Sequence, residues 1–161
     1  MKTFLLSLAV VFVLPPLLRA QDTASANEDI TYHSLGFQAS LVSGIGISYG
    51  INEQNRYRFR ATGGLITSSD KSYYSFGFDY QYELTKNKPF RVFIGLGGGI
   101  RGKSGSETNT ALGLGSGIEG PVTGTGIFEN VTIGAEIYYP TFYFSSSTIS
   151  VGGGIFISYN F

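Results

Sequence analysis

Between Ile149 and Phe161, apolar side chains occupy every second position, with Gly153 as the one exception. The positions between them hold serine, glycine and asparagine, apart from Phe156. Successive side chains of a β-strand point to opposite faces, so this segment predicts a strand with one apolar face and one small, polar face. A fold for this chain must give the apolar face an apolar environment and the polar face a polar one. That requirement constrains the architecture more than any other feature of the sequence.

The same alternation recurs along the rest of the chain. It is found in segments 35–51, 57–65, 74–84, 90–101, 112–118 and 130–139. Polar connections separate these segments, at residues 52–55, 68–71, 85–89, 102–110, 120–126 and 140–147. Beyond the first twenty residues, every lysine lies in one of these connections. The order of strands and short connections predicts an all-β chain of consecutive antiparallel strands.

Segment 35–51 is too long to be one spanning strand. At ~3.4 Å per residue it would extend over roughly 57 Å, whereas about 9–11 residues suffice to cross a membrane as a tilted strand. We therefore expect two strands joined by a three-residue connection, Val42-Ser43-Gly44, which pairs Leu41 with Ile45 and places Gly44 at the left-handed position. This makes eight strands and returns both chain ends to the periplasmic side. One bent strand, giving seven in total, is the alternative.

Alternation alone does not tell which face is outside, because a soluble lipocalin-like barrel also alternates. The composition decides between the two. Charged residues make up only 14 % of the chain, against about 25 % in a typical soluble domain, and the small, polar face carries no lysine. Aromatic residues of the other face lie near strand ends, as a membrane-boundary girdle requires; they are Tyr49, Tyr57, Tyr82, Phe90, Tyr139, Tyr159 and Phe161. We predict an antiparallel up-and-down transmembrane β-barrel.

The N-terminal segment has the features of a cleavable signal peptide. Lys2 precedes an apolar run over residues 4–18, which Pro15 and Pro16 interrupt, and Leu18-Arg19-Ala20 fits a cleavage site. Ala24-Ser25-Ala26 is a second candidate site. The expected organisation is a signal peptide at 1–20, a short segment at 21–30 and the barrel at 31–161.

From about residue 30 to residue 161, the chain resembles the small eight-stranded outer-membrane barrels of the OmpA-transmembrane and OmpX-like kind. The most specific part is the alternating row Ile155, Ile157, Tyr159 and Phe161. The resemblance implies that this row is the signal read by the barrel-assembly machinery. It also implies a monomer in the lipid of the outer membrane of a Gram-negative-type bacterium, and it carries over no catalytic residue.

Charged residues share the small, polar face of several strands and should meet inside the barrel. Antiparallel pairing brings Arg58 or Arg60 near Asp79, and pairing of Leu84 with Phe90 sets Glu83 opposite Arg91. The expected interior charge network consists of Arg56, Arg58, Arg60, Asp79, Glu83, Arg91 and Glu136. An eight-stranded barrel is just wide enough for its own side chains, so we interpret the network as structural. A path for an ion or a small ligand is the alternative.

Other functional classes find little support in the sequence. The formal net charge is zero, which argues against a nucleic-acid partner. There is no cysteine, and metal-ligand spacing is absent. We expect no cofactor and no catalysis. Two alternatives stay open: a lipid-modifying membrane enzyme that uses Glu136, Asp79 or the single histidine, His33, and a secreted soluble barrel that binds an apolar ligand.

Overall fold

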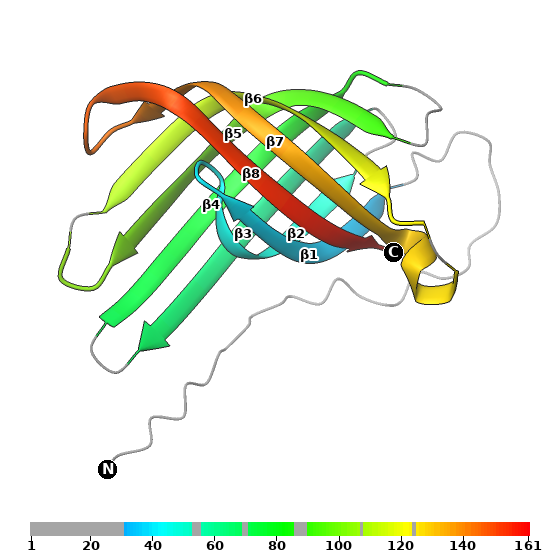
Figure 1. Cartoon of the computed structure of the whole chain (residues 1–161), viewed down its shortest axis with the longest axis horizontal. Coiled ribbons are helices and arrows are strands. Elements are labelled where there is room, and N and C mark those ends of the chain that lie inside the picture. Colours follow the sequence, from blue (N-terminus) through cyan, green and yellow to red (C-terminus); the bar gives the residue numbers. More distant parts are fainter. Residues whose placement is uncertain (1–30, 53–55, 69–70, 86–89, 107, 124) are drawn as a thin grey trace, which may run out of the picture.

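The chain folds into one closed antiparallel barrel, with each strand hydrogen-bonded to its neighbours in sequence and β1 paired with β8 (Figure 1). The computed structural model describes residues 31–161 except 53–55, 69–70, 86–89, 107 and 124. The strands are β1 (Tyr32–Ser40), β2 (Gly44–Asn52), β3 (Tyr57–Ser68), β4 (Lys71–Glu83), β5 (Arg91–Lys103), β6 (Asn109–Pro121), β7 (Val131–Tyr143) and β8 (Thr148–Asn160). A short 3₁₀ helix, η1 (Gly126–Asn130), precedes β7. None of the described residues belongs to a helix long and apolar enough to span a membrane.

The prediction of eight strands in up-and-down order is therefore confirmed. The barrel closes where β1 meets β8, and the backbones of His33 and Phe161 exchange two hydrogen bonds of 2.9 Å at that seam. The predicted signal peptide and the segment at 21–30 lie outside the described residues.

The distribution of side chains is the reverse of that in a soluble protein. Phe76, Ile133 and Ile157 lie on the outer surface with 53 %, 56 % and 46 % of their area exposed. Arg58 and Asp79 lie inside, with exposures of only 3 % and 1 %. A water-soluble barrel that binds an apolar ligand would need the opposite arrangement. The structure thus confirms the predicted direction of the two faces and contradicts the soluble alternative.

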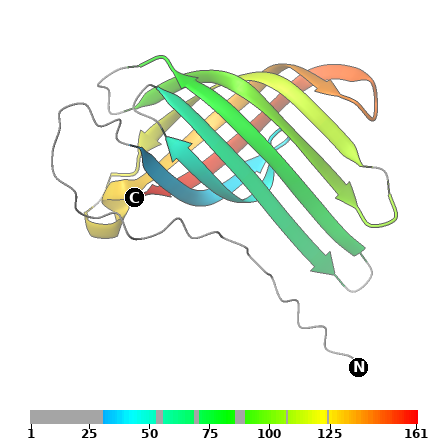
Figure 2. The ribbon, with the colours of Figure 1, turned by 180° about the vertical axis from the view of Figure 1, so that it is seen from behind.

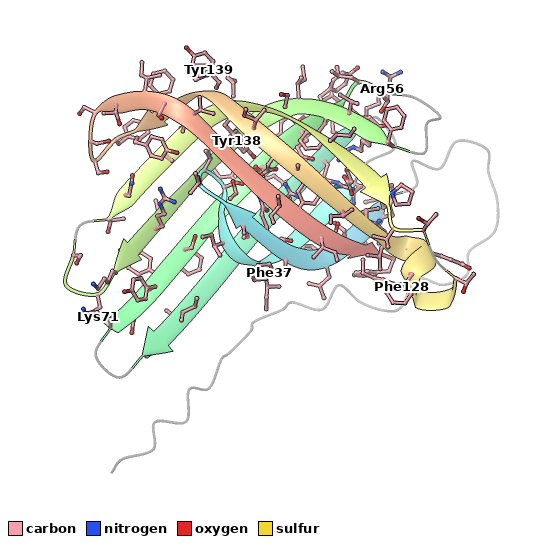
Figure 3. The ribbon with its side chains drawn as sticks, in the orientation of Figure 1. Phe37, Arg56, Lys71, Phe128, Tyr138 and Tyr139 are labelled. Carbon is pink, nitrogen blue, oxygen red and sulfur yellow. The ribbon has the colours of Figure 1, made fainter. Side chains whose placement is uncertain are left out.

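Neighbouring residues of β7 show the two directions. Tyr139 projects from the outer surface, as Phe37 of β1 does, whereas Tyr138 lies within the barrel (Figure 3). Their exposures are 70 % for Tyr139 and 2 % for Tyr138.

The division of segment 35–51 into two strands is confirmed, but its register differs from the prediction. Ile45 pairs with Ala39 rather than with Leu41, and the connection is Leu41-Val42-Ser43. Its length is odd, as predicted, so the two strands keep their apolar side chains on one face. Gly44 follows the connection with a φ of 97°, a left-handed conformation that glycine adopts without steric cost.

The β1–β2 hairpin is shorter than the rest of the barrel, and its turn folds into the lumen. β1 and β2 have 9 residues each, whereas β4 to β8 have 13. Val42 and Ser43 of the turn are buried, with exposures of 2 % and 0 %. In Figures 1 and 2 the hairpin ends partway along the barrel, while β3 and β8 continue beyond it. The turn therefore closes the lumen from within.

Strand β7 is longer than the sequence indicated. We expected a connection at 140–147, but β7 continues through Pro140 to Tyr143. A β-bulge lies between Tyr138 and Thr141, a position that tolerates proline within a sheet. Because the bulge adds a residue, the inward positions change from Tyr138 to Thr141, and the period-two pattern is interrupted there.

Two lysines that we expected in connections belong to strands instead. Lys71 begins β4 and Lys103 ends β5, because both strands run farther than the alternation predicted. Lys86 and Lys88 lie outside the described residues.

Candidate functional site

Gln38 of β1 is at the centre of the polar interior and is completely buried. Its Nε2 lies 2.6 Å from Oγ of Ser43, 3.0 Å from Oδ2 of Asp79 and 2.9 Å from Oε1 of Glu136. Its Oε1 accepts a hydrogen bond of 2.7 Å from the hydroxyl of Thr62. One amide thus joins the β1–β2 turn to three other strands, as buried polar groups require partners.

Arg60 compensates the two carboxylates of this central cluster. Its Nη2 lies 3.1 Å from Oδ2 of Asp79 and 2.7 Å from Oε2 of Glu136. Its guanidinium carbon lies 4.0 Å from the centre of the Phe156 ring, a cation–π arrangement. One buried cation therefore faces two buried carboxylates, and the remaining acceptor capacity is taken up by neutral donors.

Tyr138 is another of these neutral donors. Its hydroxyl donates a hydrogen bond to Oδ1 of Asp79 from across the lumen, and lies 3.4 Å from Oγ of Ser43. Ser43 in turn donates to Glu136 at 3.2 Å. The central cluster thus consists of side chains from β1, β3, β4 and β7 together with the inserted turn.

A second cluster lies toward the end of the barrel where β1 begins and β8 ends. Glu119 of β6 forms ion pairs with Arg58 and with Arg91, the latter at 3.0 Å. Thr132 donates to Glu119 at 2.7 Å, and Arg91 also contacts Glu83 at 3.4 Å. In both clusters together, four carboxylates form ion pairs with three arginines.

The structure brings together most of the residues expected in the interior network. Arg58, Arg60, Asp79, Glu83, Arg91 and Glu136 all take part in its ion pairs. The pair between Glu83 and Arg91 is diagonal, because the register of β4 with β5 differs by two residues from the prediction and sets Glu83 opposite Phe93.

Arg56 does not join the network. It precedes β3 with a φ of 74°, so the period-two pattern does not extend to it. Its side chain lies at the end of the barrel (Figure 3), and within the described part of the chain it forms no ion pair.

Sequence reasoning missed several members of the network, among them Gln38, Ser43, Glu119 and Tyr138. Glu119 could have been found, because it continues the inward positions Gly113, Gly115 and Gly117 of β6 by one step. Gln38 and Tyr138 also occupy inward positions, but they carry no charge and were not considered. Ser43 had no such signal, since turn residues usually lie at the surface.

The residues named for an enzymatic alternative are not brought together. His33 lies on the outer face of β1, where its Nδ1 is 2.8 Å from the hydroxyl of Tyr49. Asp79 and Glu136 are buried in the lumen. The histidine and the carboxylates therefore lie on opposite faces of the barrel wall. Among the described residues, no cluster of His, Asp and Glu could hold a metal ion.

One solved structure supports the architecture. No family model and no curated protein matches the chain. Among solved structures, the N-terminal β-barrel domain of Pseudomonas aeruginosa OprF is similar, with a TM-score of 0.51 and 14 % identity. The likeness covers 81 % of this chain and 96 % of that domain. The fold is that of a small eight-stranded outer-membrane barrel.

A second similar structure is Neisserial surface protein A, with a TM-score of 0.42 and 18 % identity, over 81 % of this chain and 94 % of that protein. At these identities the likeness concerns the barrel fold alone. The role of this eight-stranded barrel must therefore be argued from its own residues.

Proposed function

We propose that this protein resides in the outer membrane of a Gram-negative-type bacterium, reaches it through its signal peptide, and has a structural or surface-interaction role without catalysis. The observation that carries the proposal is the reversed distribution of side chains. Phe76 and Ile133 would be exposed to water in a soluble protein, whereas Arg58 and Asp79 are buried and paired. Hydrocarbon around the barrel makes both placements favourable.

The polar interior fits a structural role. Gln38, Ser43 and Thr141 are completely buried, and the inserted β1–β2 turn occupies the lumen at their level. Each charge in the two clusters has a partner of opposite sign, as buried charges require. We infer that the network holds the turn in place and rigidifies the barrel, and that it does not conduct. Current steps in planar bilayers containing the purified protein would contradict this role.

Two partners are proposed on the outer face. Membrane lipid would contact the exposed aromatic and aliphatic side chains of all eight strands. The row formed by Ile155, Ile157, Tyr159 and Phe161 faces outward, with exposures between 41 % and 65 %, and is accessible to the barrel-assembly machinery before insertion. The proposed state in the membrane is a monomer.

Residence and orientation can be tested with single cysteines, because the chain has none of its own. Ser104 lies exposed between β5 and β6, and Glu129 lies exposed in η1 at the other end of the barrel. With a membrane-impermeant maleimide on intact cells, we expect Ser104→Cys to react and Glu129→Cys to react only after the outer membrane is permeabilised. The reverse pattern would contradict the proposed orientation.

A second measurement tests membrane integration itself. Carbonate or urea washing of isolated membranes should leave the protein in the pellet, because its outer surface is apolar. Release into the supernatant would contradict the proposed residence.

A further inference from the structure

The wall of the barrel is incomplete beside the short hairpin. β2 pairs with β3 only between Ile47↔Gly63 and Asn52↔Arg58, so residues 64–68 of β3 continue without a β2 partner. On the other side, the pairing of β1 with β8 ends at Ser40↔Gly154. Leu41 adds one hydrogen bond to Gly153, and residues 148–152 continue without a β1 partner, paired only with β7. Among the described residues of the half beyond the hairpin, no backbone hydrogen bond therefore joins β3 to β8, the strands that flank the hairpin.

Beside this opening lies a groove of about 640 Å³, lined by residues of β2, β3, β4 and β5. That volume lies within the roughly 300–1,000 Å³ typical of ligand sites. Its lining includes Ile45, Ile66, Tyr73, Ser75, Arg101 and Lys103. The β1–β2 hairpin limits the groove on the side of the central cluster, because the amide of Ile45 is bonded to Ser75 at 2.9 Å.

The register places the charged and aromatic residues of the groove side by side. Lys103 pairs with Tyr73, and Tyr73 pairs with Ile66 on its other side, so these three side chains form one inward row. Arg101 lies opposite Ser75 in the next row. The ammonium group of Lys103 lies 5.6 Å from the centre of the Tyr73 ring.

These cations differ from the arginines of the central clusters. Among the described residues, neither Arg101 nor Lys103 forms an ion pair, and both side chains are only partly buried. The groove also includes Ile47 and Leu65, which are exposed on the lipid-facing side with 51 % and 49 % of their area accessible. One end of the groove thus carries positive charge, and the other is continuous with the apolar outer face.

We propose that this groove binds an anionic membrane lipid, which enters sideways between β3 and β8. Its acyl chain lies along Ile45, Ile47 and Leu65, and its headgroup is held by Arg101 and Lys103. The charge complementarity selects an anionic headgroup, and the continuity with the lipid-facing surface selects a membrane lipid over a solute from water. The inference rests on the proposed membrane residence.

The absence of tryptophan from the chain allows a single-site test. Tyr73→Trp places one indole in the groove and retains an aromatic ring beside Lys103. The variant is reconstituted into phosphatidylcholine vesicles containing a minor fraction of lipid brominated on its acyl chains, either phosphatidylglycerol or phosphatidylcholine. Bromine quenches the indole on contact. We expect brominated phosphatidylglycerol to quench at a lower fraction, by a factor on the order of ten for two nearby cations.

Two further sets of variants make the result specific. In Tyr73→Trp carrying Arg101→Gln and Lys103→Gln, the preference for phosphatidylglycerol should vanish. With Arg101→Lys and Lys103→Arg it should persist, because the positive charge is kept. Phe142→Trp is the matched control, since Phe142 lies in the same half of the barrel but faces lipid directly. Both brominated lipids should quench it equally.

The outcomes separate this inference from the proposed residence. Equal quenching of Tyr73→Trp by the two lipids, with Phe142→Trp also quenched, would overturn the groove and leave the membrane barrel intact. A preference that survives the double glutamine change would overturn the assignment of Arg101 and Lys103. No quenching of Phe142→Trp by either lipid would contradict membrane residence, and the groove with it.

Discussion

The amide nitrogen of Ile45 donates a hydrogen bond of 2.9 Å to Oγ of Ser75, which ties the beginning of β2 to the inner face of β4. The pairing of β2 with its neighbour β3 begins only at Ile47, two residues after Ile45. The bond therefore joins β2 directly to β4, with no β3 partner between them, and holds the hairpin in the position where its turn closes the barrel.

Removal of this hydroxyl should loosen the hairpin. Ser75→Ala leaves the amide of Ile45 without its partner, and we expect a loss of about 1 kcal/mol in the free energy of unfolding. Urea unfolding in detergent micelles, followed by circular dichroism, measures it. Ser146→Ala in the exposed β7–β8 turn is the control and should change stability by less than about 0.5 kcal/mol. Equal effects of the two changes would show that the bond to Ser75 does not hold the hairpin.

The space beneath the turn should tolerate no additional carbon. A Cβ at Gly77 would overlap the carbonyl group of Ser43, so Gly77→Ala must displace either the turn or β4. Overpacking of this kind costs about 1–3 kcal/mol. At Gly153 the nearest atom to a new Cβ is a carbonyl oxygen at 3.6 Å, an ordinary contact, and Gly153→Ala should be neutral. The comparison is made by the same urea titration, and a neutral Gly77→Ala would mean that the turn is not seated on β4.

The central cluster should respond unequally to the loss of its cation and of one anion. Arg60→Gln leaves Asp79 and Glu136 buried without a counter-charge, and we expect a loss of about 3–5 kcal/mol in stability. Glu136→Gln leaves one carboxylate with one guanidinium and should cost distinctly less. The fraction of heat-modifiable folded protein on unboiled gels, together with urea midpoints, distinguishes them. Equal losses would refute the charge balance described for Arg60.

Depth in the membrane should govern the cost of a charge on the outer face. Ile137 lies in the middle of β7 and Ile149 near the beginning of β8, and both are exposed outward. Ile137→Arg should cost about 2–4 kcal/mol and Ile149→Arg about 0–1 kcal/mol. Unfolding in lipid bilayers gives both values. A reversed order would place the membrane elsewhere along the barrel.

Much of the barrel follows from a single property of its strands. Period-two alternation indicated each strand and divided its side chains between two faces, and the composition of those faces indicated which one is outward. The same reasoning placed Asp79 near Arg58 or Arg60, and the structure pairs it with Arg60. Strand ends were less accurate: Lys103 and Pro140 proved to be strand residues, since cross-strand hydrogen bonds extend a strand beyond its apolar pattern.

Register and turn placement could not be predicted with the same accuracy. Two predicted pairings were wrong by two residues: Ile45 pairs with Ala39, and Glu83 pairs with Phe93. In both cases every side chain keeps its predicted face of the sheet. Alternation does not distinguish strand registers that differ by two residues. The geometry of the turn distinguishes them, but the amino-acid composition of these connections does not specify that geometry. The inward position of Ser43 depends on open space above Gly77, a three-dimensional property that no local pattern contains.

Because the β1–β2 hairpin is short, the height of the barrel wall differs around the barrel axis. A neighbour that approaches across β5 or β6 meets a wall of full height, whereas one that approaches across β1 and β2 meets a step with exposed backbone above it. Lipids and proteins that diffuse in the membrane therefore meet a different surface on the β1–β2 side of this barrel than on its β5–β6 side.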